Sequence, residues 1–342
     1  MRIVVLGTGP FAVPTFQSLL DSPPEVAALI TRPTAPAKGR EKTPTNPMRQ
    51  LAESHGLAVH APQSVNSEEG RQLLEQLAPE LLVVCDYGQI LSADILALSP
   101  LGGINLHASL LPKYRGAAPI QWALLSGESE TGVSVIHMTP RLDGGPILAV
   151  RTTPIGSDET HPELEHRLAN LGVEPVQEAI GLLAAWDRTS SIGTRQDPAQ
   201  ATKAPRLKKE HGAVDWTRTA EQIRNQVRAL KPWPGTFTFW RRPGQEPLRI
   251  VIDNVSVLGL GIRAAARVAG LEIPATANSV GQPRYAPGQV IVSDGKQLIV
   301  ATGEGGLAIA QIAPAGKRHM NVEEFLRGYR IREGELLGGA VS

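Results

Sequence analysis

The N-terminal half of the chain alternates short unbroken hydrophobic runs with segments whose hydrophobic residues recur every three or four positions. RIVVL at residues 2–6 and LLVVC at residues 81–85 are two such runs. Unbroken runs are typical of strands buried on both faces of a parallel sheet, so we expect a doubly wound, mostly parallel α/β sheet, Rossmann-like in its layers. The pattern predicts strands at residues 2–6, 26–30, 57–60, 81–85, 103–106 and 132–138, and helices at residues 16–20, 47–55, 68–77, 120–126, 159–171 and 173–186.

The pattern changes after residue 188. Residues 189–209 are rich in Ser, Thr, Pro, Gln and basic residues and lack hydrophobic periodicity, which is typical of a linker. Beyond them, short strand-like runs separated by turns predict a smaller β-barrel, similar to an oligonucleotide-binding fold. We therefore expect a catalytic domain at residues 1–188, a linker at 189–209 and a C-terminal barrel at 210–342. Strands are predicted in that barrel at residues 236–240, 248–257, 289–292, 298–301 and 307–312, and helices at 220–230 and 322–330.

Composition narrows the class of protein. With 342 residues, 42% of them hydrophobic and 20% charged, the chain is long enough for two packed domains. Its single cysteine, Cys85, excludes an internal disulfide, and no Cys/His cluster has the spacing of a zinc site, so no metal is expected. No hydrophobic stretch approaches the ~18 residues that span a bilayer, and no export signal opens the chain. A cytoplasmic protein without a membrane partner is expected.

Charge is distributed unevenly along the chain. The net charge is −6 up to residue 204 and +7 after it. A basic C-terminal part favours a polyanionic partner, and nucleic acid is the first candidate.

A glycine cluster follows the first predicted strand. GTGPFA at residues 7–12 formally matches the dinucleotide fingerprint G-x-G-x-x-G/A. However, Thr31 and Arg32 close the second strand where an NAD enzyme carries an acidic residue, and Pro10 removes an N–H that a pyrophosphate would need. We therefore expect a tight turn that shapes a pocket. An NADP-binding oxidoreductase that uses Arg32 is the alternative.

The candidate chemistry lies around residues 103–120. Asn105 and His107 are two positions apart on an extended segment, so both side chains point to one face. An amide can stabilise an oxyanion and a neutral imidazole can accept a proton near pH 7. Further along, Asp143 precedes two glycines on a loop that we expect beside the same sheet edge, where its carboxylate could polarise His107. Together these three residues predict an acyl-transfer site without a protein nucleophile.

The surrounding motifs together resemble the 10-formyltetrahydrofolate-dependent formyltransferases. They are GTGPFAVP at residues 7–14, VVCDYGQIL at 83–91, INLHASLLPKYRGAAPI at 104–120 and LDGG at 142–145. The resemblance implies that Asn105, His107 and Asp143 are catalytic and that 10-formyltetrahydrofolate is the formyl-donating cosubstrate. The folate-binding residues that it implies are Asp86, Tyr87, Gly88, Gln89, Ile90, Leu91, Ser109, Leu110, Leu111, Pro112, Leu142 and Gly144.

Within this family the chain is similar to members that formylate the α-amino group of initiator methionyl-tRNA. The similarity rests on APRLKKEHGAVDW at residues 204–216, ALKPWPGTF at 229–237 and APAGKRHM at 313–320, and on the Pro-rich, cationic segment 31–47. It implies that N-formylmethionyl-tRNA, used in translation initiation, and tetrahydrofolate are the products, and we expect a monomer. The tRNA-binding residues that it implies are Lys38, Arg40, Lys42, Lys208, Lys209, Lys317 and Arg318.

Three features depart from the family's pattern. In segment 31–47, Arg40 stands beside the glycine instead of in the family's G-R-G-K run, so which cation contacts RNA stays open. Asp86 stands where a small apolar residue is expected, and Gly9–Pro10 replaces a Pro-acid pair. Two alternatives also remain: a formyltransferase acting on an amino-sugar nucleotide, and a tRNA-binding protein without activity. The cationic segment 31–47 and the basic C-terminal part argue against the sugar, which would need neither.

Overall fold

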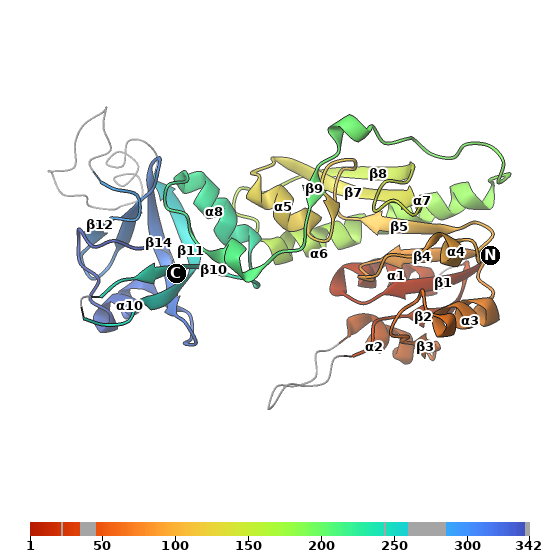
Figure 1. The fold of residues 1–342 in the computed structure, drawn as a ribbon, viewed down its shortest axis with the longest axis horizontal. Helices are drawn as coiled ribbons and strands as arrows, with labels where there is room; N and C mark the ends of the chain where they lie inside the picture. Colours follow the sequence, from red (N-terminus) through yellow and green to blue (C-terminus); the bar gives the residue numbers. More distant parts are fainter. Residues whose placement is uncertain (22, 35–45, 243, 259–284, 339–342) are drawn as a thin grey trace. The chain divides into compact units, whose positions relative to one another are not determined.

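The chain forms two compact units, shown as a ribbon in Figure 1. The computed structural model describes all residues except 22, 35–45, 243, 259–284 and 339–342. Unit 1 comprises residues 1–123, 129–157 and 163–206, and unit 2 comprises residues 124–128, 158–162 and 207–342.

Unit 1 contains a seven-stranded sheet in the order β3-β2-β1-β4-β5-β7-β8. The first five of these strands along the chain pair in parallel, whereas β7 runs antiparallel to both β5 and β8. The strands are β1 (Arg2–Gly7), β2 (Glu25–Ile30), β3 (Val59–His60), β4 (Leu81–Cys85), β5 (Gly103–His107), β7 (Glu130–His137) and β8 (Ile147–Pro154).

Helices cover both faces of this sheet. Val4, Leu6, Leu82 and Val84 pack in one hydrophobic cluster with Leu74 of α3, so α3 and α4 lie on that face. On the other side, α1 contacts both α2 and α7, and α7 contacts β7 and β8. The helices are α1 (Val13–Leu20), α2 (Pro47–Ser54), α3 (Glu68–Leu77), α4 (Ala93–Leu96), α5 (Pro119–Leu125), α6 (His161–Leu171) and α7 (Val173–Ala184).

The segment predicted as a linker folds differently from that expectation. Its residues up to Arg206 belong to unit 1, where β9 (Lys203–Ala204) pairs in parallel with β6 (Arg115–Gly116). Thr194 and Ile147 also exchange two backbone hydrogen bonds of 2.8 Å. The segment has few hydrophobic residues because backbone hydrogen bonds hold it to unit 1, and a hydrophobic side-chain core does not. This low hydrophobicity is what suggested a linker. It also contains two short 3₁₀ helices, η2 (Pro198–Gln200) and η3 (Lys209–Gly212), the second in unit 2.

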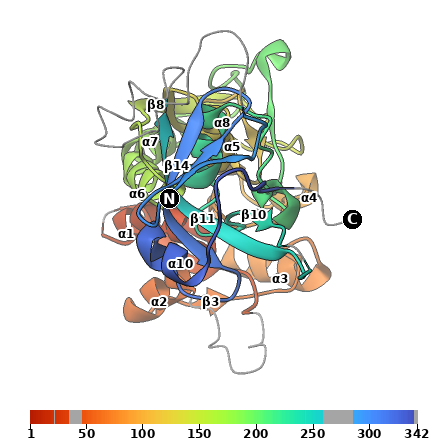
Figure 2. The ribbon, with the colours of Figure 1, turned by 90° about the vertical axis from the view of Figure 1, so that its left-hand side faces the viewer.

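Unit 2 is built on a six-stranded antiparallel sheet in the order β10-β11-β14-β13-β12, with β15 paired to β14. Figure 2 shows β10, β11, β14 and α10 from a second direction. The elements are α8 (Ala220–Ala229), β10 (Thr236–Trp240), β11 (Leu248–Leu258), β12 (Val290–Ser293), β13 (Leu298–Ala301), β14 (Gly306–Pro314), β15 (Met320–Asn321) and α10 (Val322–Gly328).

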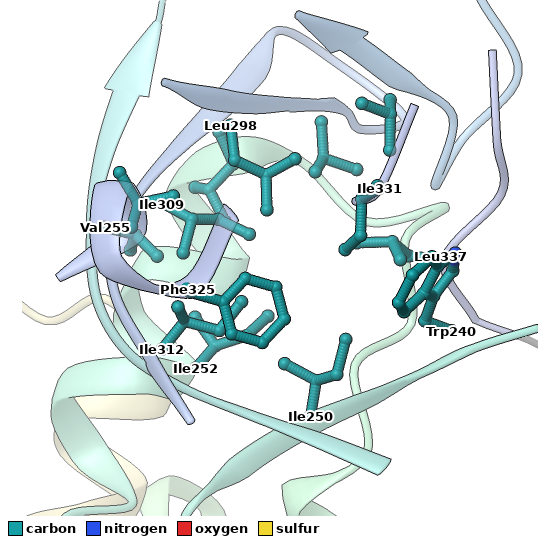
Figure 3. Packing of buried hydrophobic residues seen from close by; sticks show 14 of the residues in the cluster. Trp240, Ile250, Ile252, Val255, Leu298, Ile309, Ile312, Phe325, Ile331 and Leu337 are labelled. Carbon is teal, nitrogen blue, oxygen red and sulfur yellow. The ribbon is translucent and has the colours of Figure 1, made fainter. Parts of the chain in front are cut away.

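The core of unit 2 lies between this sheet and its helices. Phe325 of α10 is fully buried and faces Ile250, Ile252 and Ile312 from the strands (Figure 3). Alternate residues are buried along β10 and in β11 as far as Ile252, which is the period-2 pattern of strands that present one face to a core. Beyond Ile252 the register of β11 shifts, and its buried residues are three apart. The fold-class prediction is confirmed: a mostly parallel α/β unit is followed by a smaller antiparallel β unit.

Several elements were absent from the sequence prediction. They are α4, the two short strands β6 and β9 that pair with each other, and β8, which lies beside β7 at the edge of the sheet. Alternate residues of β8 beyond its buried start are exposed, so it lacks a continuous hydrophobic run. Among the described residues, no helix is long and apolar enough to cross a membrane.

Candidate active site

Strand β5 presents the two residues that the sequence singled out. Asn105 pairs in register with Val84 of β4, and His107 pairs with Ser134 of β7. Being two residues apart, Asn105 and His107 point to the same face of the sheet. Asn105 is half-buried, and its side-chain amide has no hydrogen-bond partner among the described residues. Its N–H groups are therefore available to a bound molecule.

The imidazole of His107 is held by a backbone carbonyl. Its Nε2 lies 2.9 Å from the carbonyl oxygen of Tyr114, and its Nδ1 lies 3.8 Å from Oδ2 of Asp143. A carbonyl oxygen can only accept a hydrogen bond, so Nε2 carries the proton in the neutral ring. Nδ1 is then the nitrogen that can accept a proton, and it would do so beside a carboxylate.

Asp143 reaches this pair from an unexpected direction. Since β7 is antiparallel to β5, the β7–β8 loop leaves the sheet beside Gly103, at the end of β5 opposite His107. The loop then returns toward His107, and the backbone N–H of Gly116 donates to the Asp143 carboxylate over 2.9 Å. The predicted approach of the Asp143 carboxylate to His107 is therefore present, although the loop that carries it starts at the opposite end of β5.

Two close backbone approaches fix the loops around Asp143. A Cβ on Gly145 would lie 1.8 Å from the carbonyl oxygen of His137, and a Cβ on Gly116 would lie 2.5 Å from that of Ala204. Gly116 also has a φ of +129°, which L residues rarely adopt. Only glycine fits either position without displacing its neighbour.

Part of the predicted folate loop after β4 is structural. Tyr87 and Leu91 are buried in the hydrophobic cluster beneath the loop. The Gln89 side chain accepts from the backbone N–H of Val65 over 3.0 Å and donates to the carbonyl of Gln63 over 3.1 Å. These side chains hold the loop, so any folate contact would come from their backbone.

Other predicted folate residues remain accessible. Ile90 is 59% exposed and Leu142 is 52% exposed, which is unusual for large hydrophobic side chains. Gly88 is exposed and Gly144 is partly exposed, and neither has a side chain to obstruct a ligand. Exposed hydrophobic groups beside unobstructed backbone on both loops suit a flat heteroaromatic ring.

The segment after His107 contributes less side-chain surface than predicted. Ser109 is fully buried and its hydroxyl donates to the carbonyl of Lys113 over 2.7 Å. Leu111 is also buried, whereas Leu110 and Pro112 are partly exposed. Because both of these side chains are buried in the loop, any folate contact of Ser109 or Leu111 would come from their backbone.

Asp86 lies against the glycine turn. It adopts a left-handed backbone conformation with a φ of +47°, and a Cβ on Gly9 would clash with its carboxylate. Part of the side chain is accessible to solvent, yet desolvation by the surrounding protein, together with the negative charge of Glu165, raises the pKa of Asp86 to about 6. The carboxylates of Asp86 and Glu165 have no hydrogen-bond or ion-pair partner among the described residues. The small residue at position 9 thus makes room for the acidic residue at position 86.

The predicted tRNA-binding cations fall into two groups. Three of them lie outside the described residues: Lys38, Arg40 and Lys42. Four are exposed on unit 2: Lys208, Lys209, Lys317 and Arg318. Of the latter, Arg318 forms an ion pair with Glu324, and the other three side chains have no partner among the described residues.

Sequence reasoning missed three contributors to the site. Tyr114 and Gly116 act through backbone atoms, which no side-chain motif reveals. Gln196 bonds the loop that carries Asp143, but it lies in the low-hydrophobicity segment and carries no recognisable signal. Within the described ranges, no group of three or more His, Cys, Asp or Glu could hold a metal ion.

Comparison with known proteins defines the class. Residues 1–180 match the formyl transferase family, and residues 206–330 match the formyl transferase C-terminal domain. The chain therefore belongs to the formyltransferase family.

Two relatives that match almost end to end carry the same name. The chain is 46% identical to the methionyl-tRNA formyltransferase of Rhodopirellula baltica, covering 98% of this chain and 96% of the relative. It is 40% identical to the methionyl-tRNA formyltransferase of Pelobacter propionicus, covering 99% of this chain and 97% of the relative.

Solved structures share the fold at low identity. An N-formyltransferase from Helicobacter canadensis, in complex with folinic acid and dTDP-3-aminofucose, is 16% identical with a TM-score of 0.60; the match covers 92% of this chain and all of that one. HypX from Aquifex aeolicus, in complex with tetrahydrofolic acid, is 17% identical with a TM-score of 0.57, covering 99% of this chain and 51% of HypX.

Proposed function

We propose that this protein transfers the formyl group of 10-formyltetrahydrofolate to the α-amino group of initiator methionyl-tRNA, giving N-formylmethionyl-tRNA for translation initiation in the cytoplasm. The observation that carries the proposal is the Asn105 amide, which has no partner among the described residues and lies on the same sheet face as His107, the partner of Asp143. The full-length relatives named methionyl-tRNA formyltransferase support the choice of acceptor.

The residues suit the folate cosubstrate. Exposed Ile90 and Leu142 offer hydrophobic contact to the pterin ring, and the backbone of the two loops offers hydrogen bonds to its polar edge. When bound, 10-formyltetrahydrofolate supplies an electrophilic formyl carbon on N10. No metal is needed to polarise that carbonyl if an amide donor meets its oxygen.

The chemistry follows from the atoms that face the site. The neutral α-amine of the methionyl ester attacks the formyl carbon, and Asn105 donates to the oxyanion that forms. The proton released from the amine passes to Nδ1 of His107, and the Asp143 carboxylate stabilises the resulting imidazolium. Collapse of the tetrahedral intermediate returns a proton to N10 as the bond from the formyl carbon to N10 breaks. Tetrahydrofolate and N-formylmethionyl-tRNA leave.

The exposed basic side chains of unit 2 suit the phosphate backbone of the tRNA acceptor. Lys208 and Lys209 lie near the start of segment 207–342 of unit 2, and Lys317 lies on the turn after β14. Phosphate contacts of this kind depend strongly on salt and little on sequence. We therefore assign these residues to tRNA binding and expect the enzyme to act as a monomer.

Single-turnover transfer of labelled formyl from 10-formyltetrahydrofolate tests the proposal. The acceptors are initiator methionyl-tRNA, elongator methionyl-tRNA and a 4-amino-sugar nucleotide. Label on initiator methionyl-tRNA supports the proposal. Label on the sugar nucleotide alone would replace the acceptor while keeping the chemistry, and no label on any acceptor would overturn the function.

A further inference from the structure

Gln196 makes a complete set of hydrogen bonds between two loops of the candidate active site. Its Nε2 donates to the carbonyl oxygens of Asp143 and Gly145, over 2.8 and 2.7 Å. Its Oε1 accepts from Nε and Nη2 of Arg115, over 3.1 and 2.7 Å. An amide has two N–H donors and one oxygen with two lone pairs, so every bonding position is used.

The partners also fix which way the amide points. The two carbonyl oxygens can only accept, and the guanidinium of Arg115 can only donate. The reverse orientation of Gln196 would place acceptor against acceptor and donor against donor. A carboxylate or a hydrocarbon side chain at this position could not satisfy both loops, whatever its size.

These bonds complete a ring around the Asp143 carboxylate. Gln196 holds the side chain of Arg115, the next residue Gly116 donates its backbone N–H to Oδ2 of Asp143, and the carbonyl of Asp143 returns to Gln196. Asp143 needs this support because its φ of +47° is disfavoured for a residue with a side chain. Both its backbone and its carboxylate are therefore fixed from outside its own loop.

The backbone on both sides of Gln196 is held by hydrogen bonds to other parts of unit 1. The neighbouring residue Thr194 exchanges two hydrogen bonds with Ile147 at the start of β8. Further along, Lys203 and Ala204 pair with Arg115 and Gly116. The segment is thus held on both sides of Gln196, and the amide can transmit that rigidity to the loop of Asp143.

We propose that Gln196 is a positioning residue for formyl transfer, which holds Asp143 at the distance from which its carboxylate acts on His107. The inference rests on the proposed function. It assigns a catalytic consequence to the segment that follows α7, although no atom of Gln196 need touch either substrate.

The test compares Gln196→Ala with a matched control, Gln200→Ala. Gln200 lies four residues further along on η2, is exposed and, among the described residues, forms hydrogen bonds only with Asp197. A displacement of about 1 Å at a catalytic group costs up to roughly 10²-fold in rate, so we expect kcat of Gln196→Ala to fall about 10- to 100-fold. The KM for methionyl-tRNA should stay within about threefold, since no contact with that substrate is lost. Gln200→Ala should match the wild type.

A double-mutant cycle with Asp143→Asn separates positioning from general stability. If Gln196 acts through Asp143, adding Gln196→Ala to Asp143→Asn should reduce the rate by less than about twofold further. An equal loss in both backgrounds would overturn the proposal, because a merely structural residue would act independently of Asp143.

Gln196→Glu provides a second variant that keeps the size and the bond to Arg115. Its carboxylate would face the two carbonyl oxygens, so we expect a loss comparable with that of Gln196→Ala. Wild-type activity in Gln196→Glu would overturn the proposal, since the contact with Arg115 alone would then suffice. These outcomes are read against wild-type transfer to initiator methionyl-tRNA. Failure of the wild type itself would contradict the proposed function, whereas an active wild type with an equally active Gln196→Ala contradicts only this inference.

Discussion

Removal of the Asn105 amide should abolish most of the catalysis while leaving the fold intact. In the structure this amide has no partner among the described residues, so Asn105→Ala breaks no hydrogen bond within them. In the proposed mechanism, the substitution removes the donor that meets the reacting carbonyl oxygen. The loss should therefore fall on the transition state, where the formyl oxygen carries negative charge.

The magnitude follows from comparable oxyanion donors. Loss of one such donor costs about 10²–10³ in kcat, or about 2.7–4 kcal/mol of transition-state stabilisation. Substitution of a half-buried side chain without internal bonds costs stability within about 1 kcal/mol, and that shifts Tm by less than about 4 °C in a protein of this size. The kcat of Asn105→Ala should thus fall about a hundredfold or more while its Tm stays close to that of the wild type.

Single-turnover formyl transfer at saturating substrates, with thermal unfolding on the same samples, measures both quantities. Asn105→Asp is the matched variant, since it keeps the size of the side chain but places a negative charge near the oxyanion, and it should be at least as impaired. Turnover of Asn105→Ala within threefold of wild type would refute the assignment. So would a loss that disappears once the fraction of unfolded protein is taken into account.

Three further outcomes are expected. Gly116→Ala should displace the loop that binds Asp143, because a Cβ there would lie 2.5 Å from the carbonyl oxygen of Ala204 in β9. Single-turnover kcat should fall by about 10²-fold if the shift approaches 1 Å. Unchanged turnover would contradict this prediction and mean that the loop adapts. Asp86→Asn should raise Tm at pH 8 but not at pH 4. The pKa of Asp86 is about 6 in the folded protein and 3.8 ordinarily, so the folded state binds the proton more tightly. The wild type therefore loses stability as pH rises between these two values, and the neutral Asn does not. An equal effect at both pH values in thermal unfolding would contradict this. Substitution of Lys208 and Lys209 by alanine should weaken tRNA binding and reduce the slope of log affinity against log salt by about 1–2, measured by filter binding; an unaltered slope would place the phosphate contacts elsewhere.

The sequence predicted the strongest elements because their signals are local. Unbroken runs such as LLVVC mark buried strands wherever they occur, and Asn105 and His107 share a face because they are two apart on one strand. Strand β8 was missed since much of it alternates with exposed residues at the sheet edge. The nature of residues 189–206 was also missed, because backbone pairing with distant loops leaves no periodicity in side chains.

The sequence by itself determined the chemical groups, the order of α/β and β units, and the family. Residue type and short-range spacing carry that information, and both are present in the linear chain. Only the tertiary structure decided how the groups meet. The loop after the antiparallel strand β7 brings Asp143 to His107, and the carbonyl of Tyr114 selects the protonated nitrogen of that imidazole. Gln196 joins the loop of Asp143 to that of Arg115. These contacts depend on backbone atoms and on long-range closure, which the packing of the whole unit stabilises and no local pattern encodes.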